Sequence, residues 1–106
     1  MNTRPTPAQI SPDQLPAAMA QVPGWRLTGE NSALALENDW RFASHAEVML
    51  FVNALNWMAE KLNHHPEVVL QHAHCVVRWR THDVKGLSPL DFEAARQTDS
   101  LTGTWA

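Results

Sequence analysis

The feature that most constrains the fold is one long amphipathic helix in the middle of the chain. Ser44-His45-Ala46-Glu47 has the S-x-x-E pattern of a capping box, whose serine and glutamate side chains bind free backbone N–H groups at a helix start. Because Pro66 disfavours helical backbone at the residue before it, we expect the helix to end near Asn63. Apolar residues recur between these limits at spacings of three and four, as along one face of a helix: Val48, Phe51, Val52, Leu55, Met58, Ala59 and Leu62.

Shorter segments on either side of this helix alternate apolar and polar residues, which indicates strands. Residues 25–28 and 33–42 predict one hairpin, with a turn at Gly29-Glu30-Asn31. Residues 68–70 and 75–80 predict a second hairpin after the helix. We therefore expect two antiparallel hairpins, one before and one after the long helix.

Two further helix starts of the same form lie near the ends of the chain. Ser11-Pro12 and Ser88-Pro89 each place a proline at the first helical position after a serine cap. The first predicts a short helix to about residue 21, ended by Pro23-Gly24, and the second predicts a last helix to about residue 98.

The expected order of elements is α-β-β-α-β-β-α, which defines an α+β fold. It has a four-stranded antiparallel sheet with three helices packed on one face, and its other face and its edges are available to partner subunits. We expect residues 1–10 to be a flexible N-terminal arm and residues 11–106 to form a single domain, with a frayed tail at 99–106.

The composition excludes several classes of protein. The 106 residues suit one domain, and 44% of them are hydrophobic, as in a globular protein. A net charge of −3 without a basic run gives no electrostatic footprint for nucleic acid. No apolar run approaches the roughly 18 residues of a membrane span, and the N-terminus lacks the apolar region of a secretory signal. The single cysteine, Cys75, lies in an apolar run, so we expect a small buried hydrophobe in a cytoplasmic protein.

Histidines supply the candidate site, since six occur and this side chain titrates near neutral pH. Glu60 and His64 are four residues apart at the end of the long helix and share a face, so the carboxylate could hold the imidazole in one tautomer. His64-His65-Pro66 lies where the helix gives way to a strand, a junction at which side chains can point into a cleft. His82 follows the fourth strand, so it approaches His64 and His65 if the third and fourth strands pair.

Other interpretations of these residues stay open. A histidine pair at the C-terminal end of a helix can simply be solvated and favoured by the helix dipole. Zinc binding is a second interpretation, although the chain has no H-E-x-x-H motif, no paired cysteines and no evident carboxylate ligand other than Glu60. Nucleophilic catalysis by Cys75 or a serine lacks a neighbouring base in the pattern. For His45, His72 and His74 we expect no role in the site, because they lie in a first helical turn and in a turn between strands.

The spaced histidine motif resembles that of a known family. Its parts are Glu60-Lys61-Leu62-Asn63-His64-His65-Pro66, Thr81-His82, Gly86-Leu87-Ser88 and Asp91, with Gly24-Trp25 and Trp40-Arg41-Phe42 upstream. In this spacing, over about residues 12–98, the chain resembles the pterin-4a-carbinolamine dehydratase family. It departs from the family at two positions of the third strand, Val68 and His72, where the family commonly has aromatic residues.

The resemblance implies a dehydratase that removes water from 4a-hydroxy-tetrahydropterin to give quinonoid dihydropterin. This reaction recycles the tetrahydropterin cofactor of aromatic amino acid hydroxylases. The resemblance also implies a small-molecule pterin substrate, a homodimer or homotetramer, and neither a metal nor an organic cofactor. Family members also act as dimerisation cofactors for a transcription factor, so the alternative is a non-enzymatic binding module of the same fold.

The resemblance further assigns residues to two roles. The catalytic group comprises His64, His82, His65 and Glu60, and the substrate-binding group comprises His65, Asp91 and Thr81. His64 and His82 would be the acid–base pair, in an order that stays open, and Glu60 would orient His64. His65 would mainly hold the pterin ring. Asp91 would support the loop of the third histidine, and its alternative role is that of an N3 carboxylate in the last helix.

Overall fold

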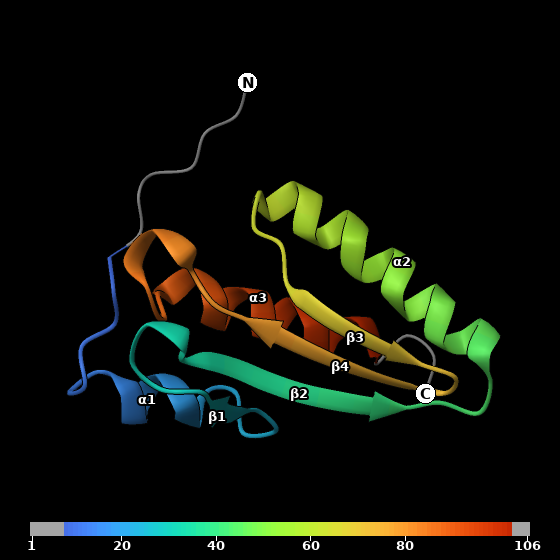
Figure 1. Cartoon of the computed structure of the whole chain (residues 1–106), viewed down its shortest axis with the longest axis horizontal. Coiled ribbons are helices and arrows are strands. Elements are labelled where there is room, and N and C mark those ends of the chain that lie inside the picture. The colour runs from blue at the N-terminus through green and yellow to red at the C-terminus, as the bar shows by residue number, and fades with distance from the viewer. Residues whose placement is uncertain (1–7, 103–106) are drawn as a thin grey trace.

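The computed structural model describes residues 8–102, and its elements follow the expected order. The helices are α1 (Leu15–Ala20), α2 (His45–Leu62) and α3 (Pro89–Thr102), with two short 3-10 turns, η1 (Asn31–Ala33) and η2 (His82–Val84). The strands are β1 (Arg26–Thr28), β2 (Ala35–Arg41), β3 (Glu67–Gln71) and β4 (His74–Trp79). They form one antiparallel sheet in the order β1-β2-β4-β3. The three helices pack on one face of the sheet, so the α+β fold expected from the sequence is confirmed (Figure 1).

The long helix α2 has the boundaries that its capping pattern predicts. The Ser44 hydroxyl accepts a hydrogen bond from the Glu47 N–H (3.2 Å), and the Glu47 carboxylate accepts one from the Ala43 N–H (3.1 Å). At the other end Asn63 adopts a left-handed conformation (φ 51°), which stops the helix before Pro66. The apolar face of α2 is buried in the core through Val48, Phe51, Leu55, Met58 and Ala59. None of the helices within residues 8–102 is long and apolar enough to cross a membrane.

The sheet has one covered face and one uncovered face, and we call the uncovered side the open face. Along β4, Val77 and Trp79 are buried against the helices, while the residues between them point the other way. Trp79 pairs with Leu36 of β2, and both side chains are fully buried. On the open face, Glu37 of β2 pairs in register with Arg78 of β4.

The C-terminal helix is longer than predicted. α3 continues to Thr102, so the frayed tail expected from residue 99 onward is wrong for residues 99–102. Thr98 accepts a hydrogen bond from the indole N–H of Trp79 (3.1 Å), and Asp99 accepts one from the indole N–H of Trp25 (2.9 Å). These bonds hold the last turns of α3 against the sheet. Residues 103–106 lie outside the described residues.

The N-terminal helix is shorter than predicted. The Gln14 side chain accepts a hydrogen bond from the Ser11 N–H (3.1 Å) and closes a turn, so regular helix begins only at Leu15. Before this turn, the Ile10 N–H donates to the Leu87 carbonyl (2.8 Å), so the expected flexible arm already contacts the domain at residue 10. The first seven residues of the expected arm lie outside the described residues.

Candidate active site

The predicted histidines meet at one end of the sheet, where α2 stops and β4 leads into η2. His64 and His65 follow directly after α2, and His82 is the first residue of η2. Because β3 and β4 pair along their length, the residues before β3 and after β4 are neighbours in space. A pocket of about 220 Å³ lies there, and we call it the histidine pocket. Its lining consists of Asn63, His64, His65, Arg80, His82 and Asp83.

His64 turns inward from the end of α2. Its side chain is 5% exposed, and its ring stacks on the indole of Trp79 with the ring centres 5.2 Å apart. Nε2 of His64 lies 2.7 Å from Oδ1 of Asp91. An ionised carboxylate only accepts hydrogen bonds, so in this contact a proton belongs on Nε2, and in the neutral imidazole Nδ1 is then the acceptor. Residues from β4 and α3 therefore hold His64 in one orientation and one tautomer.

Asp91 is the centre of a buried hydrogen-bond cluster at the start of α3. Its Oδ2 atom accepts from the Thr81 hydroxyl (2.7 Å) and from the Ser88 N–H (3.0 Å), while Oδ1 binds His64. The hydroxyls of Ser88 and Thr81 lie 2.7 Å apart, and every buried polar side-chain atom in the described residues has a partner. Both sequence interpretations of Asp91 therefore hold together, because it caps α3 and supports the segment that leads into His82.

Two of the expected substrate-binding residues, Thr81 and Asp91, belong to this buried cluster. Thr81 and Asp91 are 0% exposed, and their side-chain oxygens are engaged with each other, with Ser88 and with His64. In the structure they hold His64 and the residue before His82, and their contact with substrate stays a prediction. A spaced motif indicates which residues are near one another, but it does not indicate which of them face solvent.

Glu60 contacts a different histidine from the one predicted. Its Oε1 atom lies 2.9 Å from Nε2 of His65, whereas His64 binds Asp91. The left-handed turn at Asn63 explains the difference, because it sends His64 into the core and leaves His65 outside, beside Glu60. Glu60 and His65 are 70% and 57% exposed, so water screens this pair and it restrains the ring only weakly.

His82 lies on a short loop that is closed at its base. The Thr81 N–H donates to the Gly86 carbonyl (2.8 Å), and Lys85 takes a left-handed conformation (φ 54°) that turns the chain back. His82 itself is exposed and lines the histidine pocket. The pocket thus combines one buried imidazole, which Asp91 holds, with two accessible imidazoles.

A larger hollow of about 530 Å³ adjoins the histidine pocket on the open face, and we call it the sheet hollow. His65, Arg80 and His82 line both spaces, so they form the wall between them. The sheet hollow extends from this wall across β4 and β2 as far as Gly29. Arg80 was not among the predicted site residues. Its signal in the sequence is its place two residues before His82, on the segment that leaves β4.

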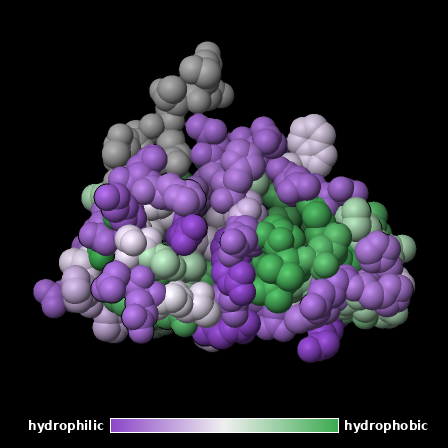
Figure 2. All heavy atoms as spheres, viewed as in Figure 1, coloured by the Kyte–Doolittle hydropathy of each residue, from purple (hydrophilic) through white to green (hydrophobic). Residues whose placement is uncertain are grey.

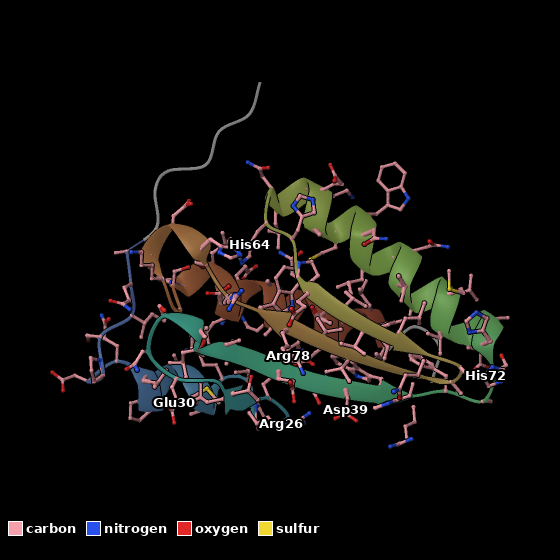
Figure 3. The ribbon with its side chains drawn as sticks, in the orientation of Figure 1. Arg26, Glu30, Asp39, His64, His72 and Arg78 are labelled. Carbon is pink, nitrogen blue, oxygen red and sulfur yellow. The ribbon has the colours of Figure 1, made fainter. Side chains whose placement is uncertain are left out.

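A band of paired charges borders the sheet hollow on the open face (Figures 2 and 3). Glu37, whose side chain is 10% exposed, accepts hydrogen bonds from Arg26 and Arg78. Arg78 also binds Glu67 (2.9 Å), and Arg26 also binds Asp39 (3.1 Å). Burial opposes the ionisation of Glu37, but the two guanidinium groups outweigh it and hold the pKa of this carboxyl below its usual value. Both arginines of the band are therefore neutralised by carboxylates within it.

The remaining histidines and the cysteine lie away from the histidine pocket. His45 and His72 stack on each other with ring centres 5.6 Å apart, and Figure 3 shows His72 at the far end of the sheet from His64. His74 contacts Asp39 of the band of paired charges, with Nε2 of the ring 2.7 Å from Oδ2 of the carboxylate. Burial raises the pKa of the Cys75 thiol to about 11, so this residue is a buried hydrophobe as expected and not a nucleophile. Within residues 8–102, no three or more His, Cys, Asp or Glu side chains are arranged to hold a metal ion.

The fold and the site together define a small α+β protein in which one buried and two accessible imidazoles line a pocket at the end of the sheet. Residues 8–101 match the model of the family described as Pterin 4 alpha carbinolamine dehydratase. The chain belongs to this family, and the family predicted from the histidine motif is thereby confirmed.

Individual relatives agree with this assignment. The chain is 41% identical over 92 residues to a protein of Paracidovorax citrulli (strain AAC00-1) that is provisionally named pterin-4-alpha-carbinolamine dehydratase, covering 87% of this chain and 79% of the relative. A crystal structure of a transcriptional coactivator/pterin dehydratase from Brucella melitensis has a TM-score of 0.80 at 24% identity, over 88% of this chain and 97% of that one. A pterin dehydratase-like protein described as a RuBisCO assembly factor in the alpha-carboxysome has a TM-score of 0.66 at 22% identity, over 76% and 90% of the two chains. At these identities the two structures support the fold alone.

Proposed function

We propose that this protein is a hydro-lyase that removes water from 4a-hydroxy-tetrahydropterin and forms quinonoid dihydropterin. In this role it recycles the tetrahydropterin cofactor of aromatic amino acid hydroxylases. The observation that carries the proposal is the histidine pocket, in which His64, held in one tautomer by Asp91, lies beside the accessible His65 and His82. The family of the chain supports the same reaction.

The reaction needs two proton transfers at neighbouring atoms of the pterin. The hydroxyl on C4a leaves as water when it receives a proton, and N5 loses its proton so that the electron pair of the N–H bond forms the C4a=N5 double bond. Positioned groups that titrate near neutral pH perform such transfers best, and each contributes about 10²–10⁴ in rate. The ordinary pKa of imidazole is about 6.5, so histidines suit both steps.

In our proposal the imidazoles of the pocket divide these tasks. Nδ1 of His64 takes the proton from N5, and the Asp91 carboxylate at Nε2 stabilises the positive charge that this puts on the ring. His82, accessible on its loop, gives a proton to the leaving hydroxyl. His65, which contacts Glu60 at 2.9 Å, holds the pterin ring.

The decisive experiment is a stopped-flow assay of dehydration with freshly generated 4a-hydroxy-tetrahydropterin. We expect His82→Ala to slow the reaction at least ~10-fold, with the urea unfolding midpoint unchanged because His82 is exposed. His45→Ala is the matched control, since it removes an exposed imidazole at the opposite end of the sheet. Wild-type rates in both His82→Ala and His64→Ala would exclude the mechanism.

We also propose that the protein is a cytoplasmic homodimer or homotetramer. β3 is an edge strand, and exposed apolar edges and patches are typical of surfaces that pair with another chain. The exposed apolar side chains on α2 and β3 are Leu50 (57%), Trp57 (72%), Val69 (38%) and Leu70 (42%). One buried cysteine suits a reducing compartment. Light scattering on the purified protein measures the number of subunits.

The same exposed side chains favour the second candidate function, a non-enzymatic binding module. Trp57 projects from α2 on the side away from the core, where a partner protein can contact it. The two candidates differ in the dehydration assay, because a binding module with intact His64 and His82 shows no turnover above the uncatalysed rate. If the protein is a binding module, Trp57→Ser should abolish binding of the partner protein.

A further inference from the structure

Arg80 occupies a position in the wall of the site that the proposed mechanism does not use. It follows β4 directly, its side chain is half-buried, and it lines both the histidine pocket and the sheet hollow together with His65 and His82. Among residues 8–102 its guanidinium has no hydrogen-bond or ion-pair partner. Removing part of the water from a charged group without giving it a partner is unfavourable, so the position points to a ligand that supplies acceptors.

The surrounding charges make Arg80 distinct from the other arginines of the open face. Arg78, which lines the same hollow, is neutralised by Glu37 and by Glu67 (2.9 Å). Arg26 is likewise neutralised by Glu37 and Asp39. Of these three arginines, Arg80 is therefore the one whose guanidinium is not paired with a carboxylate in the part of the chain that the structure describes. A guanidinium presents a planar fork of donors that matches a carboxylate or a phosphate.

The chemistry of the substrate locates the group that Arg80 would meet. This step depends on the proposed dehydratase function, in which the histidines act on C4a and N5. In a pterin N5 connects C4a to C6, so the first atom of a substituent on C6 is three bonds from the reacting carbon. A side chain that lines the pocket together with His65 and His82 is therefore within reach of the C6 substituent. The sheet hollow, with about 530 Å³ on the same wall, gives that substituent room beyond the ring.

We propose that Arg80 is a specificity-determining residue that binds an anionic group, a carboxylate or a phosphate, on the C6 substituent of the pterin. Arg26 and Arg78 are engaged with carboxylates, so Arg80 is the arginine whose donors are available to a ligand. Its position next to the acid–base histidines sets the distance between the anion and the reacting atoms. The protein would thus prefer anionic pterins to pterins whose C6 substituent is neutral.

The test compares three stable fluorescent pterins by equilibrium titration with the purified protein. They are 6-carboxypterin, the phosphate ester of 6-hydroxymethylpterin, and neutral 6-hydroxymethylpterin. We expect at least one anionic pterin to bind the wild type ~10-fold or more tightly than the neutral one, the size of one charge-assisted hydrogen bond. In Arg80→Gln this ratio should fall to within about twofold of unity. Arg41→Gln is the matched control, because Arg41 is exposed and lines neither the histidine pocket nor the sheet hollow.

Each other outcome overturns the inference in an identifiable way. Equal affinity of the wild type for all three pterins shows that Arg80 selects no anion, and a ratio that survives in Arg80→Gln shows that another group selects it. Equal weakening of all three ligands in Arg80→Gln shows a contact to the ring instead. Binding of neutral 6-hydroxymethylpterin without any preference leaves the dehydratase proposal standing, whereas failure of all three to bind removes both proposals.

Discussion

Replacing Asp91 with asparagine tests whether one buried carboxylate holds the histidine pocket together. The change keeps the shape of the side chain, but it removes the charge and replaces one oxygen by an NH₂ group. The amide oxygen can still accept from Thr81 and from the Ser88 N–H, and the NH₂ group then faces Nε2 of His64. Two donors meet at this point unless the ring proton moves to Nδ1, so the variant inverts the tautomer of His64.

The expected loss of stability follows from these contacts. A hydrogen bond to a charged group contributes about 1.5–3 kcal/mol, and a neutral one about 0.5–1.5 kcal/mol. Removing the charge therefore costs about 1 kcal/mol at each of the two retained bonds, and the altered contact to His64 adds about 1 kcal/mol. We expect the free energy of unfolding to fall by about 2–4 kcal/mol, which leaves a domain of ordinary stability, about 5–15 kcal/mol, folded.

Three measurements examine the Asp91→Asn variant. The urea unfolding midpoint should fall, the dehydration rate of the folded fraction should fall ~10-fold or more, and the NMR signals of the His64 ring should change to the Nδ1–H tautomer. Asp99→Asn is the matched control, because Asp99 lies on the same helix and accepts one hydrogen bond from Trp25 (2.9 Å) that an amide oxygen also accepts. Wild-type stability together with a wild-type rate would refute the reasoning. Lower stability with an unchanged rate would limit Asp91 to a structural role.

Two further predictions concern groups outside the histidine pocket. Because the pKa of Glu37 is lowered in the folded protein, its ionised form stabilises the fold above its ordinary value of 4.5, and this effect is lost as the pH falls through the folded-state value. Glu37→Gln should thus lower the free energy of unfolding at neutral pH by about 1–3 kcal/mol, and a difference from wild type that did not narrow near pH ~3 would contradict this origin. Cys75, with a pKa of about 11, should resist a thiol reagent at mildly alkaline pH until urea unfolds the protein, and rapid labelling in native buffer would show that the thiol is accessible.

The elements of the fold were predictable because their signals are local. The capping box at Ser44 and the apolar spacing behind it define α2 within one or two residues, and alternation of apolar and polar residues defines the strands. The length of α3 was not predictable in this way. It depends on Asp99, whose partner Trp25 lies 74 positions away in the sequence, and no local pattern reports such a contact.

The site was predictable as a set of neighbours but not as a set of orientations. Pairing of the last two strands follows from their hairpin pattern, and it brings His82 to the histidine pair. The left-handed backbone at Asn63 decides which carboxylate contacts which imidazole. An asparagine before two histidines does not by itself predict that conformation. The predicted pairing of Glu60 with His64 was therefore wrong, because Glu60 contacts His65.

The β3–β4 hairpin joins the two halves of the histidine pocket, and this restricts how the chain can change in length. Side chains alternate along a strand, so one residue added to a single strand would turn the neighbouring pocket residues to the opposite side. Length can therefore vary only by matched additions to both strands or at the tip of the hairpin. That tip, His72-Ala73, lies at the far end of the sheet from His64 (Figure 3). It is the natural place to graft a reporter peptide or a dye while the chemistry at the other end continues undisturbed.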